Sequence, residues 1–190
     1  MAFVIFVDKA AGASREQRKI HRARWVLPIA HPPIENGWVE VEDGVVVGIG
    51  AEQPRSSDQD PARAAQHDRA ILPGLVNAHT HLELSWMRNQ VPPAPSMPQW
   101  VERLMALRRT VGHEPREPIA QAIREARASG TVLFGDITNT LAAYEALADS
   151  GTPAAVFREL LGFNVADPEE VLRAARAQLA GLKPTGLLRP

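Results

Sequence analysis

The stretch 71–86, ILPGLVNAHTHLELSW, is an apolar run that ends in two histidines one residue apart. On a β-strand alternate side chains share a face, so His79 and His81 point into the same small volume. Pro73 and Gly74 interrupt the chain before the run, which becomes polar only at its carboxyl end. We therefore predict a strand that presents a pair of imidazoles where it ends.

The segments that follow alternate between helix and strand patterns. Near-continuous apolar runs are typical of buried parallel strands. Ser96 and Gln99 have the spacing of a capping box before the first helix, and Asp167 and Glu170 have it before the last. Alternation of this kind predicts an α/β fold with a parallel sheet. The further predicted strands are 131–137 and 153–163, and the predicted helices are 96–107, 117–129, 138–151 and 167–181.

The chain before the histidine strand has the pattern of short antiparallel strands. Residues 20–29 form one strand pattern and residues 37–50 form a hairpin, in which Asp43 and Gly44 make the turn. A polar, proline-broken segment follows and predicts a loop at 51–69. The predicted organisation is an extension at 1–19, a β-unit at 20–70 and an α/β unit at 71–190.

Composition limits the chemistry that the chain can perform. It has no cysteine, which excludes disulfides, thiolate ligands and a cysteine nucleophile. Its net charge is −1 and it has no long basic run, so we expect no nucleic-acid partner. No apolar run approaches the roughly 20 residues that span a bilayer, and the first residues lack the charge pattern of a signal peptide. We therefore expect a cytoplasmic protein without a membrane partner, whose metal ligands are nitrogen or oxygen atoms.

The segment LPGLVNAHTHLE resembles the first barrel strand of the amidohydrolase superfamily, in the branch of deaminases and chlorohydrolases that act on amino-substituted heterocycles. HRARWVLPIAHPPIENGWVEVEDG and NAHTHLELS look most like aminodeoxyfutalosine and adenosine-type deaminases. The resemblance implies a partial TIM-type barrel at 71–190, with about its first three βα units, and a β-sandwich portion at 20–70. A complete barrel of this type takes about 250 residues, so we expect the chain to be a truncated copy.

The resemblance also implies roles for single residues. His79 and His81 would bind a divalent metal, zinc or else iron, that lowers the pKa of a bound water. The resulting hydroxide would displace an amino group or a halide from a nucleoside-like or other heterocyclic small molecule. Glu83, Trp86 and Glu159 are candidates for contact with that substrate. The remaining metal ligands and the acid–base residues of the family are expected beyond the chain end.

Several alternatives stay open at this level. Glu83, Asp136 and Glu159 could each be a strand-end carboxylate satisfied by backbone donors. Trp86 could cover the edge of the barrel instead of stacking on a ring. Arg158 and Glu159 should face opposite ways on their strand, and the sequence does not say which faces the barrel interior. The chain as a whole could be a non-catalytic metal-binding or assembly fragment, and self-association is an open expectation.

Overall fold

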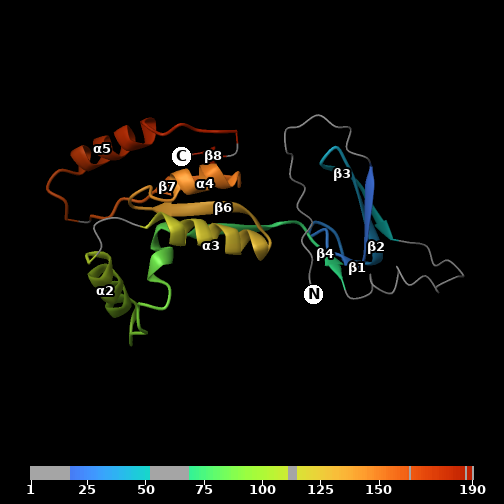
Figure 1. Ribbon diagram of the computed structural model, residues 1–190, viewed down its shortest axis with the longest axis horizontal. Coiled ribbons are helices and arrows are strands. Elements are labelled where there is room, and N and C mark those ends of the chain that lie inside the picture. Colours follow the sequence, from blue (N-terminus) through green and yellow to red (C-terminus); the bar gives the residue numbers. More distant parts are fainter. Residues whose placement is uncertain (1–17, 52–68, 111–114, 163, 187, 190) are drawn as a thin grey trace, which may run out of the picture. The chain divides into compact units, whose positions relative to one another are not determined.

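The computed structural model describes residues 18–51, 69–110, 115–162, 164–186 and 188–189. The chain forms two compact units, of which the first ends at Leu75 and the second begins at Val76 (Figure 1). Each unit has a four-stranded sheet. Most of the predicted extension and of the predicted loop, at 1–17 and 52–68, lies outside the described residues.

The first unit has a mixed sheet in the order β3-β2-β1-β4. The pairs β1–β2 and β2–β3 are antiparallel, and β4 pairs parallel with β1. The predicted turn at Asp43 and Gly44 is confirmed: both residues have positive φ, 49° and 76°, as a tight two-residue hairpin requires. The strands are β1 (Lys19–Val26), β2 (Ile34–Glu42), β3 (Val45–Ala51) and β4 (Ala70–Ile71).

The second unit alternates strands with helices around a sheet in the order β5-β6-β7-β8. The pairs β6–β7 and β7–β8 are parallel, so the predicted α/β fold with a parallel sheet is confirmed. Its elements are β5 (Leu75–Thr80), the 3-10 helix η1 (Leu82–Met87), α2 (Met97–Arg108), α3 (Arg116–Ala128), β6 (Thr131–Thr138), α4 (Tyr144–Ser150), β7 (Ala154–Arg158), α5 (Pro168–Ala180) and β8 (Leu188–Arg189).

The core of the second unit lies between its sheet and the helices α3 and α4. Ile119 and Ile123 are one helical turn apart and form an apolar stripe on α3. They are almost fully buried in one cluster with Leu147 of α4, Phe134 of β6 and Val156 of β7. Burial of each such side chain stabilises the fold by about 2 kcal/mol. The core therefore fixes the positions of β6 and β7.

Some predicted boundaries were wrong. The helix predicted from 138 begins at Tyr144, because Thr138 still belongs to β6 and its hydroxyl accepts the Leu141 N–H at 2.9 Å. The strand predicted at 153–163 ends at Arg158. The sequence also predicted neither η1 nor the fourth strand β8.

The two predicted capping boxes have different outcomes. Asp167 accepts the Glu170 N–H at 2.9 Å, so the cap of α5 is confirmed. Ser96 makes no side-chain hydrogen bond at the start of α2, so the other box was wrong. Pro98 removes one of the two backbone donors that an N-cap side chain uses.

Across the described residues, no helix has both the length and the apolar character needed to cross a membrane.

Candidate metal and substrate site

The two histidines lie at the carboxyl end of β5, with His79 in the strand and His81 just past it. Their Nε2 atoms are 3.4 Å apart, and their ring planes meet at 60° with centroids 5.3 Å apart. Two nitrogen ligands of one tetrahedral zinc ion, each at 2.0–2.1 Å, lie about 3.3 Å from each other. The imidazole pair therefore already has the separation that a shared ion requires.

The chemistry of the pair fits a divalent transition metal, because neutral imidazole is a common ligand for zinc and iron. Within the described part of the chain, no group of three or more His, Cys, Asp or Glu side chains is placed to hold an ion. A catalytic zinc usually has three protein ligands and a water. The described residues thus offer two of the three protein ligands that such a site would need.

Glu83, two residues after His81, is a buried carboxylate with no exposed surface. Its oxygens accept hydrogen bonds from the Thr138 hydroxyl at 2.5 Å and from the Thr140 hydroxyl at 2.6 Å. The backbone N–H groups of Asn139 and Thr140 each donate to it at 3.0 Å. Arg108 of α2 adds an ion pair at 2.7 Å. One carboxylate therefore joins η1, the end of β6 and α2.

The charge state of Glu83 follows from these donors. Burial raises the pKa of the Glu83 carboxyl, but the hydroxyls of Thr138 and Thr140 and the two backbone amides lower it by more. Its pKa therefore lies below the ordinary value, and the group is ionised at neutral pH. With all its surface covered, Glu83 has the geometry of a strand-end carboxylate satisfied by protein donors, the second of the two interpretations that the sequence left open.

Asp136 of β6 is a second fully buried carboxyl group in this region. Its Oδ1 accepts the Leu82 N–H at 2.9 Å, whereas its Oδ2 has no hydrogen-bond partner among the described residues. Burial raises the pKa of Asp136 to about 7; the Leu82 N–H acts against this, and the negative charge of Glu83 adds to it. The neutral acid is therefore well populated at neutral pH.

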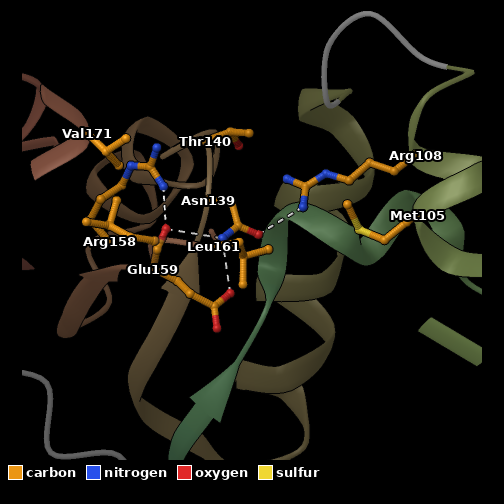
Figure 2. A pocket seen from close by; sticks show the side chains of 9 residues that line it. Met105, Arg108, Asn139, Thr140, Arg158, Glu159, Leu161 and Val171 are labelled. Atoms are coloured by element: carbon orange, nitrogen blue, oxygen red, sulfur yellow. Dashed lines mark hydrogen bonds between the residues drawn. The ribbon is translucent and has the colours of Figure 1, made fainter. Parts of the chain in front are cut away.

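A cavity of about 290 Å³ lies beside the carboxyl ends of β6 and β7 (Figure 2). The side chain of Asn139 lines the cavity and links two other lining residues. It accepts a hydrogen bond from Arg108 at 3.0 Å and donates one to the Glu159 carboxylate at 3.1 Å. Arg158 donates to Gln178 of α5 at 3.1 Å. The apolar part of the wall includes Met105, Leu161 and Val171.

Arg158, the last residue of β7, and Glu159, just past it, both belong to the lining of the cavity. Their side chains run in opposite directions in Figure 2, Arg158 toward Val171 and Glu159 away from it. Trp86, in η1, is not among the lining residues. Its indole Nε1 is buried and has no hydrogen-bond partner in the described part of the chain. The structure thus brings Glu159 to the cavity and leaves Trp86 apart from it.

Sequence reasoning missed the residues that hold Glu83 and Asn139 in place. Thr138, Asn139 and Thr140 follow an apolar strand directly, and polar residues at that position are typical of sites in parallel α/β folds. We interpreted them as the start of a helix instead. Arg108 had no such signal, because it lies at the end of an exposed helix.

Comparison with known proteins gives the family. Residues 70–183 match the Amidohydrolase family. The 5-methylthioadenosine/S-adenosylhomocysteine deaminase of Bacillus cytotoxicus is 30% identical over 145 residues, which are 72% of this chain and 33% of that protein. The deaminase of the same name from Bacillus thuringiensis is 29% identical over 146 residues, with the same two coverages. The chain thus spans about a third of the length of the curated relatives that it matches.

Two solved structures resemble this one. The Helicobacter pylori aminofutalosine deaminase in complex with methylthio-coformycin has a TM-score of 0.69 and 25% identity, over 90% of this chain and 42% of that one. The atrazine chlorohydrolase of Arthrobacter aurescens TC1 complexed with zinc shares the fold, with a TM-score of 0.60 and 19% identity over 90% of this chain and 45% of that one. The matched residues 70–183 make up more than half of the chain and include the histidine pair, Glu83, Asp136 and the residues that line the cavity, so the chain belongs to the amidohydrolase family.

Proposed function

We propose that this chain is the amino-terminal part of a metal-dependent hydrolase that removes an amino group from a nucleoside-like heterocycle. The observation that carries the proposal is the 3.4 Å separation of the Nε2 atoms of His79 and His81. The deaminases among the relatives support the reaction, and the zinc complex among the structural neighbours supports the metal.

Each of the two sheets corresponds to a different part of the proposed enzyme. The parallel sheet β5-β6-β7-β8 would form the first part of a (β/α)8 barrel at 71–190, and the strands at 20–70 would form part of a β-sandwich. In such barrels the chemistry takes place at the carboxyl ends of the strands, which is where the histidine pair lies. The further metal ligands and the acid–base residues would come from the part of the barrel that this sequence does not contain.

The residues of this chain have distinct tasks in the proposed reaction. His79 and His81 hold the divalent ion, zinc or iron, which when bound lowers the pKa of a water to about 7. Glu159 presents a carboxylate to the cavity and accepts hydrogen bonds from substrate hydroxyl groups. Trp86 does not line this cavity, so we assign it the other role that the sequence left open, covering the edge of the barrel.

Zinc binding to the 190-residue chain tests the metal role. We expect the wild type to bind Zn²⁺ weakly, because it offers two of the three usual protein ligands, and either His79→Ala or His81→Ala to lose this binding, because a single imidazole remains. His31→Ala is the matched control, since His31 lies in the first unit and is exposed. Calorimetric titration measures all four proteins. Full Zn²⁺ binding by His79→Ala would contradict the assignment.

Ammonia release tests the reaction in a longer protein that contains this chain and the remaining barrel. 5-Methylthioadenosine is the first substrate to try, because it appears in the names of the relatives. Release that disappears in His81→Ala would support the proposal. Zinc binding without turnover of any aminated heterocycle would favour the non-catalytic metal-binding fragment instead.

A further inference from the structure

We propose that Glu83 is a positioning residue for the histidine pair: its buried carboxylate ties the segment directly after His81 to the end of β6 and to α2. The inference rests on the metal role proposed above for His79 and His81. It assigns to Glu83 no contact with the metal or with the substrate, since the side chain has no exposed surface.

Two consecutive anchors follow His81 along the chain. The Leu82 backbone N–H donates to Asp136 Oδ1 at 2.9 Å, and the Leu82 side chain is buried in the core of the second unit. The next residue, Glu83, is held by its side chain. On the other side of His81 lies β5, which carries His79. The backbone that presents the second imidazole is therefore fixed both before and after it.

The donors around Glu83 require a carboxylate. Two hydroxyls, from Thr138 and Thr140, and two backbone N–H groups converge on its two oxygens. A glutamine has only one acceptor oxygen, so its NH₂ group would face either the donors of Thr138 and Thr140 or those of Asn139 and Arg108. Charge-assisted bonds of this kind are also shorter and stronger than neutral ones. A neutral side chain of the same shape therefore cannot hold the segment in the same place.

The anchor is also connected to the cavity. Arg108 donates to Glu83 at 2.7 Å and to Asn139 at 3.0 Å, and Asn139 donates to the Glu159 carboxylate. Figure 2 shows this chain of contacts from Arg108 through Asn139 to Glu159. The Glu83 carboxylate thus holds one end of a polar network whose other end is Glu159, the proposed substrate contact.

Titration with Co²⁺ alone tests the proposal on the 190-residue chain. Co²⁺ absorption reports the ligand geometry, and ¹⁵N spectra of the imidazoles report the environment of each histidine. For Glu83→Gln we expect about tenfold weaker Co²⁺ binding or more, as for other groups that orient a metal ligand. We also expect an altered Co²⁺ spectrum and shifted His81 signals. The signals of His21 and His31, in the first unit, should stay in place and report intact folding there.

Two further comparisons separate positioning from general stability. Glu125→Gln is the matched control: Glu125 also accepts from an arginine, Arg88, but at the surface, so Co²⁺ binding should stay unchanged. Thr140→Val removes one donor to Glu83 without removing the carboxylate, and serves if Glu83→Gln does not fold. It should weaken Co²⁺ binding in the same direction, and Thr140→Ser, which keeps the hydroxyl, should restore it.

The outcomes separate this proposal from the one on which it rests. If the wild type binds Co²⁺ through His79 and His81 and both Glu83→Gln and Thr140→Val bind it with the same affinity and spectrum, the positioning role is overturned. If the wild-type imidazoles bind no Co²⁺, the metal function fails instead. The metal-free ¹⁵N signals of His81 then decide: a shift in Glu83→Gln supports positioning, and no shift overturns it.

Discussion

The backbone N–H of Leu82 donates a 2.9 Å hydrogen bond to Oδ1 of Asp136, 54 positions further along the chain. The bond joins the segment after the histidine pair to the interior of β6. It leaves Oδ2 of Asp136 buried and without a hydrogen-bond partner among the described residues. Because an ionised carboxyl group loses its hydration there, burial raises the pKa of Asp136 to about 7.

The raised pKa makes stability depend on pH. An Asp136 carboxyl in the unfolded chain ionises near its ordinary value of 3.8, whereas the folded chain keeps the proton until about pH 7. Between pH 3.8 and about 7 the folded chain therefore binds more protons than the unfolded chain. The contribution of Asp136 to the free energy of unfolding is thus largest below pH 4 and is lost as the pH rises to about 7. Asp136→Asn keeps an acceptor for Leu82 and cannot ionise. Urea unfolding should show it more stable than the wild type at pH 8, by on the order of 1–3 kcal/mol, and similar at pH 4. The same difference at both pH values would contradict the prediction.

At Gly135, β6 lies directly against the backbone of β5. A Cβ atom there would lie 2.3 Å from the carbonyl oxygen of Ala78, and a backbone atom cannot rotate away. We therefore expect Gly135→Ala to lower the free energy of unfolding by about 3 kcal/mol, the upper end for overpacking. Gly186→Ala is the control, because a Cβ atom at Gly186 meets nothing within 4 Å. Thermal unfolding compares the two, and equal midpoints would refute the steric argument.

The features that the sequence predicted are those with a short-range signal. The two-residue period of a strand was enough to place His79 and His81 on one face, and apolar runs were enough to predict a parallel sheet. β8 was not predicted, because its two residues carry no periodic pattern and the strand depends on pairing with Ala154 and Ala155 of β7.

The surroundings of Glu83 could not be predicted for a similar reason. Its partners Arg108 and Thr140 lie 25 and 57 positions away in the sequence. Thr138 has a local pattern that favours a helix cap, and its hydroxyl does accept the Leu141 N–H, but the same hydroxyl donates to Glu83 and the helix begins only at Tyr144. Tertiary contacts of this kind override local preference, and only the folded chain reveals them.

Mutation of the N-cap residues Ser96 of α2 and Asp167 of α5 should have different effects on stability. Asp167 accepts the Glu170 N–H, so Asp167→Ala should lower the free energy of unfolding by about 1 kcal/mol. Ser96 makes no such bond, so Ser96→Ala should leave it nearly unchanged, although both residues precede a helix with a similar sequence pattern. Urea unfolding followed by circular dichroism measures both. A larger loss for Ser96→Ala would show that the cap of α2 forms in solution.

The ion pair between Arg108 and Glu83 should matter far more than a surface pair of similar length. The Glu83 side chain is 0% exposed and Arg108 is 15% exposed, whereas Arg88 and Glu125 are 62% and 39% exposed at 2.6 Å. Arg108→Met leaves a buried carboxylate without its cation and should cost about 3 kcal/mol. Arg88→Met should barely change the midpoint of unfolding, because water and salt screen an exposed pair. Adding Glu83→Gln to Arg108→Met should cost less than the sum of the two single changes, since the unpaired charge is then gone. Additive losses in urea unfolding would mean that the two side chains act independently.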